Sequence, residues 1–322
     1  MDNLSLVSVI VTTYNRKEML YDTIKSILNQ TYVNFELIIV DTYSDYNFKS
    51  YIKSFNDNRI RSFQNENNGV IGINRNYGIK KSIGEYIAFC DDDDIWLPEK
   101  LEIQLQCIKT GDYIGVGCNY IKFGNTTFFR KYTNYQNHVN NKRIIIDYNK
   151  LIKGKSVPLS SLMVKRNNIL FSEDKHFICV EDWDYQIQLV KYQRKIVLIP
   201  DILLKYRILD LNKVYFEKSL NARNVIEKYR QDYIGNNYSK MMNQHYIYVS
   251  LRCIKAGRKK KALNYLQKAN EYSGIRSNIL KIIIDYVPFP VILYILRLYF
   301  NFTNLIIKFY STITFSKMII KN

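Results

Sequence analysis

The chain has 322 residues, of which 47% are hydrophobic, which is enough to bury a core and excludes a disordered polymer. Its 47 Lys and Arg against 29 Asp and Glu give a formal net charge of +18, which attracts anionic partners such as nucleic acid, an acidic membrane surface or phosphorylated substrates. Five cysteines, an odd number without CxxC spacing, argue against a disulfide framework or a zinc site and favour a reducing cytoplasm.

The first half of the chain alternates strand-like and helix-like patterns. Apolar, β-rich runs alternate with segments whose apolar residues recur at helical spacing, and Pro98 stands where a further helix would begin. The elements expected in chain order are a strand at 6–11, a helix at 16–29, strands at 35–41 and 59–64, a helix at 71–82 ended by Gly84 as its C-cap, a strand at 85–90 and a helix after Pro98. This alternation predicts an α/β fold with a mostly parallel sheet and helices on both faces.

Polar clusters directly follow three of these strands. They occupy 12–15, 41–45 and 91–94. In open α/β sheets, ligands bind beyond the carboxyl ends of the strands. Because the carboxyl ends of parallel strands lie at one edge of the sheet, we expect the three clusters to converge there and to form the functional site.

The second half of the chain has a different pattern. Further strands are expected at 113–129, 160–165 and 196–199, with helices at 181–190, 219–233, 239–256 and 258–272. We therefore assign an α/β domain to residues 1–210 and a helical region to residues 211–322. The N-terminal apolar run lacks a basic n-region and indicates a buried strand rather than a signal peptide. No uncharged stretch reaches the roughly 20 residues that a membrane-spanning helix needs.

Four consecutive aspartates, 91–94, suggest a metal site. Adjacent carboxylates raise one another's pKa unless a cation or a donor network compensates them. Mg²⁺ and Mn²⁺ are natural compensators, since both favour carboxylate and phosphate oxygens. The alternative is a solvated acidic turn that caps the helix after Pro98. The preceding strand and Trp96 favour the metal site, and the acidic run alone leaves both interpretations open.

A series of motifs runs along the first two-thirds of the chain. In order, they are Val9–Arg16, Ser26–Tyr32, Phe35–Asp41, Asn68–Gly69, Arg75–Ile79, Gly84–Ile87, Asp91–Pro98 and Glu181–Trp183. Together these segments resemble the family 2 glycosyltransferases with the GT-A fold, of the bacterial polysaccharide or O-antigen type. The resemblance implies a Rossmann-like, mostly parallel sheet and a metal-dependent, inverting transfer of a hexose from a nucleoside-diphosphate donor. The segment from Asp91 is similar to the metal-binding DxD region of the family, and the segment from Glu181 to its ED motif.

The resemblance implies which residues hold the donor sugar nucleotide. Thr12, Tyr14 and Asp41 match positions that hold the nucleoside. Arg75 matches a position near the donor phosphates, where its fork of donors suits phosphate recognition. The alternative for Arg75 is a surface arginine on a helix. Asp92 is expected beside the same diphosphate.

The resemblance also implies the residues of the chemistry. Asp93, with Asp91 nearby, would hold Mn²⁺ or Mg²⁺, which neutralises the charge that develops on the departing diphosphate. Asp91 is therefore a donor-site residue as well. Asp182 would be the general base for the acceptor hydroxyl, a role worth roughly 10²–10⁴-fold in rate, with Glu181 as its neighbour or as an acceptor ligand. Without the resemblance, Glu181 and Asp182 would be interpreted as the N-terminal charge pair of a helix.

Two segments depart from the family pattern. The family usually has a second acidic residue after the position of Asp41, and this chain has Thr42 there, where the family often contacts the uracil ring. Uridine remains the expected base, and a UDP-sugar the expected donor. The Tyr-Arg pair at 206–207 resembles a pair in the family, but the histidine that often follows it is absent.

The end of the chain, from residue 275, is apolar and aromatic with scattered lysines and arginines. One interpretation is a helix that lies in the membrane interface, with the Arg-Lys-Lys-Lys run at 258–261 adding attraction to anionic lipid. The other is a helical pair packed on the catalytic domain, with its lysines solvated. The first interpretation suits a cytoplasmic enzyme, peripheral at the inner face of the plasma membrane, that acts on a glycan or polyprenyl-linked acceptor.

Two other classes of function fit parts of the sequence. A nucleotidyltransferase shares the phosphate and metal requirements but usually carries a Gly-rich basic loop after its first strand, which 12–16 is not. A nucleic-acid- or membrane-binding protein on a catalytically inactive glycosyltransferase-like fold fits the charge of +18. No basic-aromatic module or zinc finger supports nucleic-acid binding, and an acidic run repels phosphate unless a metal is bound. No nucleic-acid partner is therefore expected.

Overall fold

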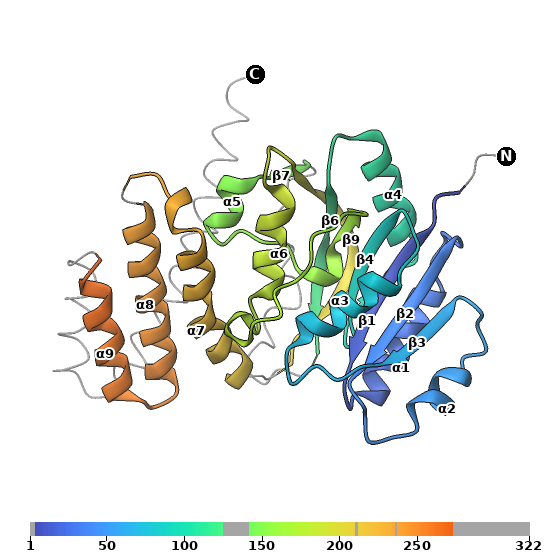
Figure 1. Ribbon diagram of the computed structural model, residues 1–322, viewed down its shortest axis with the longest axis horizontal. Coiled ribbons are helices and arrows are strands. Elements are labelled where there is room, and N and C mark those ends of the chain that lie inside the picture. The colour runs from blue at the N-terminus through green and yellow to red at the C-terminus, as the bar shows by residue number, and fades with distance from the viewer. Residues whose placement is uncertain (1–3, 125–141, 210–211, 236, 273–322) are drawn as a thin grey trace, which may run out of the picture. The chain divides into compact units, whose positions relative to one another are not determined.

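The computed structural model describes residues 4–124, 142–209, 212–235 and 237–272 (Figure 1). The chain divides into two compact units, Met1–Tyr229 and Arg230–Asn322. The first unit contains the sheet with its flanking helices, and the described part of the second contains a pair of α-helices.

The division lies later in the chain than the boundary that we expected at residue 210. Helix α7 (Asn212–Lys228) belongs to the first unit. At its end, Lys228 Nζ and the Tyr229 hydroxyl both donate to the fully buried carboxylate of Asp184, at 2.7 and 2.8 Å. These bonds join α7 to helix α6 (Glu181–Val190), which begins with the predicted acidic pair.

In the described part of the first unit, nine strands form one sheet. They are β1 (Val7–Thr13), β2 (Phe35–Asp41), β3 (Ile60–Gln64), β4 (Tyr86–Asp91), β5 (Ile95–Trp96), β6 (Gly115–Phe123), β7 (Ile144–Ile146), β8 (Met163–Lys165) and β9 (Ile196–Arg207). The order is β3-β2-β1-β4-β8-β6-β9-β5, and β7 pairs with β9. β1 to β4 are parallel, β8 runs antiparallel to both neighbours, and β6 and β9 are parallel. The sheet is mostly parallel, which confirms the predicted fold class.

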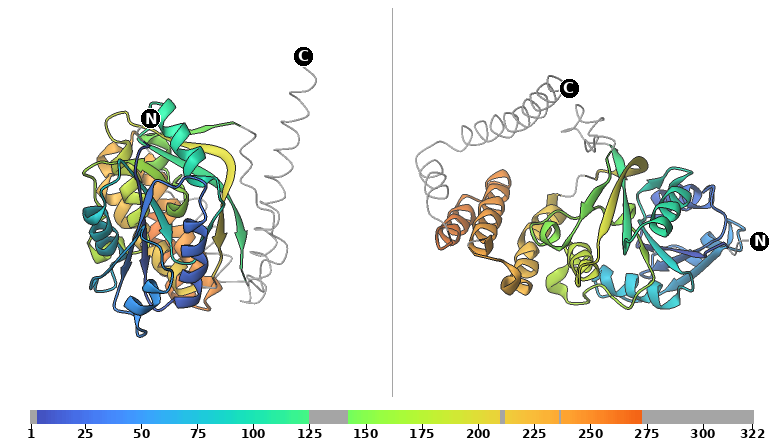
Figure 2. Two further views of the ribbon diagram at one scale, coloured as in Figure 1. Left: turned by 90° about the vertical axis from the view of Figure 1, so that its right-hand side faces the viewer. Right: turned by 90° about the horizontal axis from the view of Figure 1, so that it is seen from above.

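Helices lie on both faces of the sheet (Figure 2). Besides α6 and α7, the α-helices described in this unit are α1 (Lys17–Leu28), α2 (Phe48–Lys53), α3 (Ile71–Lys81), α4 (Lys100–Thr110) and α5 (Tyr148–Ile152). All residues of β1 and β2 are buried. This agrees with their near-continuous apolar sequences, which are typical of parallel strands covered on both faces. Leu20, Ile24 and Ile27 of α1 pack into the same core at the predicted helical spacing.

Some elements differ in extent from the prediction. β9 continues to Arg207 instead of ending at residue 199, and β6 ends at Phe123, with 125–141 outside the described residues. Helices α2 and α5 and strand β7 were not predicted, because segments of six, five and three residues show no usable periodicity. The α2 helix depends on a cap, in which Asn47 Oδ1 accepts the N–H of Ser50 at 2.9 Å.

Gly84 does not end helix α3, so that prediction was wrong. The helix ends at Lys81, and its C-cap is Ser82 in an extended conformation. Gly84 lies against the start of β1, where its N–H donates to Ser8 Oγ at 2.8 Å. A Cβ added to Gly84 would come within 2.6 Å of the Leu6 carbonyl oxygen. The position therefore requires glycine for the close approach of two backbone segments.

The carboxyl ends of β1, β2 and β4 meet at one edge of the sheet, as predicted. Thr13 at the end of β1 lies opposite Asp41 at the end of β2. On the other side of β1, Thr12 lies opposite Asp91 of β4. The parallel register thus brings the three polar clusters together, with the acidic run and the 41–45 loop on opposite sides of β1.

The second unit contains helices α8 (Asn237–Lys255) and α9 (Lys259–Asn270), joined by a turn in which Gly257 has a φ of 72°. The two helices pack against each other, and Asn243 Nδ2 donates to the Ala269 carbonyl oxygen at 2.8 Å. Both helices were predicted. Among the described residues, no helix has both the length and the apolar character required to cross a membrane. The tail from residue 275, which carried the membrane-interface interpretation, lies outside the described residues.

Candidate active site

The loops after β1 and β2 are joined by hydrogen bonds. The Asn15 N–H donates to Ser44 Oγ, and the Asp45 N–H donates to Asn15 Oδ1, both at 2.8 Å. Asn15 and Tyr43 have positive φ values of 51° and 53°, so both loops turn sharply after their strands. Tyr14 and Tyr43 each remain 57% exposed. The predicted site residue Tyr14 is therefore accessible to a ligand, and Tyr43 adds a second exposed ring in the neighbouring loop.

Thr12 and Asp41, the other residues predicted to hold the nucleoside, are buried. Both carboxylate oxygens of Asp41 already accept hydrogen bonds. Oδ1 accepts from Ser44 Oγ at 2.5 Å, and Oδ2 accepts from the Ser44 N–H and from Gln64 Nε2, each at 3.0 Å. Asp41 therefore fixes the turn that contains Tyr43.

Thr42 lies at the centre of a network of amide side chains. Its Oγ1 accepts from Asn67 Nδ2 at 3.1 Å and from Asn74 Nδ2 at 2.9 Å. The oxygen of the Asn67 amide accepts the Gly69 N–H, and the oxygen of the Asn74 amide accepts from Asn65 Nδ2. Because Oγ1 of Thr42 receives two donors, its hydroxyl proton is the group that this network leaves for a ligand.

Arg16 bridges two aspartates of the acidic run. Its Nη1 donates to Asp92 Oδ1 at 2.9 Å and to Asp93 Oδ2 at 3.1 Å. Thr13 Oγ1 donates to the other Asp92 oxygen at 2.8 Å. We did not predict roles for Thr13 or Arg16 from the sequence. The one signal for them was their position within and directly after the 12–15 cluster.

Asp94 connects the acidic run to the end of β9. Its side chain is fully buried, and its Oδ1 accepts the Arg207 N–H at 2.7 Å. Arg207 Nε in turn donates to the Asp93 carbonyl oxygen at 2.7 Å, and its guanidinium lies 4.4 Å from the ring centroid of Phe123. Arg207 therefore positions the backbone of the run, a role that the sequence did not indicate.

The acidic run carries negative charge that the protein compensates only in part. Burial, together with the charges of Asp91 and Asp92, raises the pKa of Asp93 to about 7, although Arg16 and Arg207 oppose the shift. Burial likewise raises the pKa of Asp92. The side chains of Asp91 and Asp93 are 33% and 14% exposed, against 7% for Asp92. A cation that reached Asp91 and Asp93 would relieve this repulsion.

The donor set determines which kind of metal site fits. In the described parts of the chain, no group of three His, Cys, Asp or Glu side chains is arranged to hold an ion. Asp91 and Asp93 supply two carboxylates, and Mg²⁺-like ions are commonly bound by one or two carboxylates together with water and substrate phosphates. The residues therefore fit Mg²⁺ or Mn²⁺ that arrives with a diphosphate, and they do not fit a closed protein cage.

Arg75 of α3 is buried between two carboxylates. Its Nη1 donates to Glu181 Oε1 at 2.6 Å, and its Nη2 donates to Asp91 Oδ1 at 3.0 Å. The guanidinium lies 5.3 Å from the ring centroid of Phe171. Burial alone would lower the pKa of Arg75, but the charges of Asp91, Glu181 and Asp182 raise it. The alternative of a surface arginine was wrong, since Arg75 joins the acidic run to the start of α6.

The two acidic residues at the start of α6 have different environments. Glu181 is buried, which raises its pKa although Arg75 opposes the shift, and its Oε2 has no hydrogen-bond partner. Asp182 is half-buried, and its Oδ1 accepts the N–H of Trp183 at 2.8 Å. Trp183 Nε1 donates to the Leu151 carbonyl oxygen at 2.6 Å, which anchors this turn. Asp182 is therefore the member of the pair that a ligand can reach.

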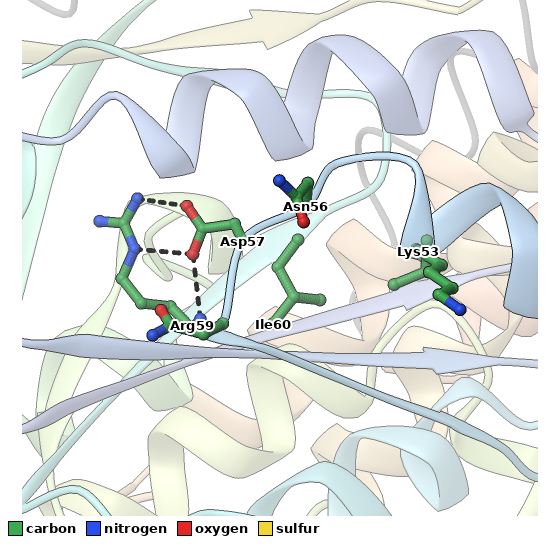
Figure 3. A pocket seen from close by; sticks show the side chains of 7 residues that line it. Lys53, Asn56, Asp57, Arg59 and Ile60 are labelled. Atoms are coloured by element: carbon green, nitrogen blue, oxygen red, sulfur yellow. Dashed lines mark hydrogen bonds and ion pairs between the residues drawn. The ribbon is translucent and has the colours of Figure 1, made fainter.

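A surface hollow lies at the opposite edge of the sheet (Figure 3). It is lined by Ile52, Lys53, Asn56, Asp57, Asn58, Arg59 and Ile60. These residues precede or begin β3, so they lie at its amino end. Arg59 Nε and Nη2 donate to the Asp57 carboxylate at 3.0 and 2.7 Å. Because these charged groups pair with each other and no predicted site residue lines the hollow, we assign it no role in the site.

Comparison with known proteins agrees with this geometry. The profile described as Glycosyl transferase family 2 matches residues 8–166. An Escherichia coli protein described as UDP-Glc:alpha-D-GlcNAc-diphosphoundecaprenol beta-1,3-glucosyltransferase WfgD is 30% identical over 263 residues, which cover 81% of this chain and 96% of that protein. The chain belongs to glycosyl transferase family 2. It is a glycosyltransferase, and the resemblance of its ordered motifs to this family is confirmed.

Solved structures share the fold of this family 2 chain at low sequence identity. S. aureus TarS 1-349 in complex with UDP-GlcNAc has a TM-score of 0.54 and 15% identity, over 83% of this chain and 92% of that chain. The mannosyltransferase PcManGT from Pyrobaculum calidifontis, in complex with GDP-Man and Mn²⁺, has a TM-score of 0.55 and 16% identity, over 88% and 82%. These similarities confirm the predicted GT-A fold.

Proposed function

We propose that this family 2 glycosyltransferase moves a hexose from a UDP-sugar to a hydroxyl of a glycan or lipid-linked oligosaccharide in cell-surface polysaccharide synthesis. The observation that carries the proposal is the bridge in which Arg75 joins Asp91 of the acidic run to Glu181, beside Asp182. The bridge connects a carboxylate pair suited to a metal diphosphate with an accessible carboxylate suited to a base. The UDP-Glc donor and diphosphoundecaprenol-linked substrate in the name of WfgD support the donor and acceptor classes.

On the donor side, we assign the nucleoside to the loops after β1 and β2. The exposed rings of Tyr14 and Tyr43 are available to stack on a base. Thr42 offers a hydroxyl proton, which suits a carbonyl oxygen of uracil. Thr12 and Asp41 are buried, so their proposed role is to support these loops from beneath.

The proposed metal-holding residues are Asp93 and Asp91. When bound there, Mn²⁺ or Mg²⁺ would neutralise the negative charge that develops on the departing diphosphate. Asp92 is held by Thr13 and Arg16, so we assign it the positioning of its neighbours beside the diphosphate. The Mn²⁺ that accompanies GDP-Man in the PcManGT complex supports the choice of ion.

Asp182 is the proposed general base. Its carboxylate takes the proton of the acceptor hydroxyl while that oxygen forms a bond to the anomeric carbon, on the face opposite the diphosphate. The bond from the anomeric carbon to the diphosphate breaks as the new bond forms, so the configuration inverts. A positioned base of this kind contributes roughly 10²–10⁴-fold. Glu181 is paired with Arg75 and buried, so it positions the first turn of α6.

We assign catalysis to the first unit, including α7, and membrane contact to the helical region that follows. Consecutive cations at 258–261 are all exposed at the start of α9, where they are suited to anionic lipid. The proposed location is the cytoplasmic face of the plasma membrane. Flotation with liposomes that contain phosphatidylglycerol tests this assignment. Replacing Lys259, Lys260 and Lys261 with glutamine should reduce binding, and equal binding of the variant and the wild type would refute the role of this cluster.

A donor screen tests the enzymatic proposal. Purified protein is incubated with MnCl₂ and a panel of sugar nucleotides, and release of nucleoside diphosphate is measured. We expect slow hydrolysis of one donor that requires Mn²⁺ and is lost in Asp93→Asn and Asp182→Asn. Asp112→Asn, which changes an exposed aspartate before β6, serves as the matched control and should keep the activity. No release and no binding of any donor by calorimetry would refute the proposal and favour a catalytically inactive relative.

A further inference from the structure

Arg16 places a positive charge on Asp93, one of the two carboxylates to which we assign the metal, and on its neighbour Asp92. One nitrogen, Nη1, lies 2.9 Å from Asp92 Oδ1 and 3.1 Å from Asp93 Oδ2. Within the described residues, these two contacts are the ion pairs of the Arg16 guanidinium. The Arg16 side chain is 35% exposed, so the contact between the guanidinium and the acidic run is open to solvent on one side.

Arg16 can leave this position without breaking a helix or a strand. It is the N-cap residue of α1, and its side chain makes no capping hydrogen bond. After its departure, Asp92 keeps the hydrogen bond from Thr13, and the Asp93 backbone keeps the one from Arg207. Moving the guanidinium therefore uncovers the Asp93 carboxylate while the acidic run stays in place.

A divalent cation held by Asp91 and Asp93 would share the Asp93 carboxylate with the Arg16 guanidinium. Two positive charges at one carboxylate repel each other, so a metal on Asp93 favours the departure of Arg16 from it. A diphosphate that arrives with the metal brings phosphate oxygens to the same place. Arginine donates charge-assisted, forked hydrogen bonds to phosphate. The donor diphosphate thus offers the displaced guanidinium a new anionic partner.

We propose that Arg16 is an exchangeable counter-ion of the donor site, which pairs with Asp92 and Asp93 in the free enzyme and moves to the donor diphosphate when a metal replaces it on Asp93. This inference rests on the proposed metal-dependent function and adds a donor-binding residue to it. The exchange couples the two ligands. Metal alone has to break the contact of Arg16 with Asp93, whereas metal with diphosphate provides Arg16 with a replacement partner.

Opposite effects on metal and nucleotide binding test the exchange. Free Mn²⁺ is measured by electron paramagnetic resonance, without nucleotide and with saturating UDP, and UDP binding in the presence of Mn²⁺ is measured by calorimetry. Arg16→Gln should bind Mn²⁺ alone about tenfold more tightly, equivalent to about 1.4 kcal/mol, and UDP with Mn²⁺ about tenfold more weakly. Arg16→Lys keeps the charge, so both of its affinities should lie between those of Arg16→Gln and the wild type.

The matched control is Arg59→Gln, which removes another arginine paired with an aspartate, at the opposite edge of the sheet (Figure 3). It should change neither affinity. If the role of Arg16 is purely structural, Arg16→Gln should bind both Mn²⁺ and UDP more weakly, and that result would overturn the exchange. Equal Mn²⁺ affinity in Arg16→Gln and the wild type would also overturn it, while the proposed function would stand. If the wild type binds UDP without any dependence on Mn²⁺, the metal-dependent function fails, and the exchange fails with it.

Discussion

The buried bridge between Asp91, Arg75 and Glu181 leads to a prediction about stability. Replacing Arg75 with methionine, which has a similar length and no charge, should destabilise the first unit by about 3–5 kcal/mol, the cost of removing one partner of a buried ion pair. The magnitude follows from burial, because the side chains of Arg75 and Glu181 are each 7% exposed. Water therefore does not reach the charge that is left on Glu181. The Asp91 side chain is 33% exposed, so water can solvate its charge once Arg75 is removed. Asp91 therefore adds little to the loss of stability.

The loss of stability in Arg75→Met should grow with pH. Burial already raises the pKa of Glu181 in the wild type, and Arg75 opposes that shift, so removing Arg75 raises the pKa further. A carboxyl group whose pKa is raised in the folded state favours folding while it is protonated. That contribution is complete below its ordinary value of 4.5 and is lost as pH rises toward the folded-state pKa. The deficit relative to the wild type should be smaller at pH 5 than at pH 8.

Urea unfolding at pH 5 and pH 8 measures this difference. The double variant Arg75→Met with Glu181→Gln should recover part of the stability at pH 8, because glutamine leaves no buried charge. Arg59→Met removes an arginine from a partly exposed pair and should cost less than about 1 kcal/mol. A loss below about 1 kcal/mol for Arg75→Met, or one that is equal at both pH values, would refute the argument that Arg75 balances a buried charge.

Further predictions concern a metal ligand, a buried lysine and a glycine. The affinity for Mn²⁺ should fall as pH drops below about 7, because the pKa of Asp93 is raised to about 7 and its protonation competes with the metal. Mn²⁺ titrations at pH 6 and pH 8 check this, and equal affinities would contradict it. Lys100 is buried, which lowers its pKa from 10.5 to about 8, so its charge opposes folding below that pH. The free energy of unfolding of the wild type should therefore rise relative to that of Lys100→Met between pH 8 and pH 10, and urea unfolding that showed no change would count against the argument. Gly84→Ala should destabilise the protein by about 1–3 kcal/mol, because the added methyl group would meet the Leu6 carbonyl; an unchanged midpoint of thermal unfolding would show that the backbone adjusts without cost.

The class of fold and the edge that holds the site followed from local patterns. The apolar runs at 6–11 and 35–41 predicted buried strands, and the segment between them had helical spacing. Polar clusters at the strand ends then had to converge, because the carboxyl ends of neighbouring parallel strands lie at one edge whatever the rest of the topology. The ordered motifs added the family, and the comparisons confirmed it.

The partners of the charged residues were decided by the tertiary structure alone. Arg75 and Glu181 are 106 positions apart in the chain, and Arg16 and Asp93 are 77 apart. The sequence showed that these residues are charged and did not show which of them neutralise one another. Lys100 is a similar case, since it lies at an unremarkable position after Pro98 but is buried in the core.

The physical reason is the range over which each signal acts. Periodicity reports which face of a single helix or strand is apolar, so it determines the elements and the direction in which each is buried. The partner of a buried charge depends on which distant segments the sheet places side by side. The order β4-β8-β6-β9 joins strands from separate parts of the chain, and no local pattern in those strands specifies their neighbours.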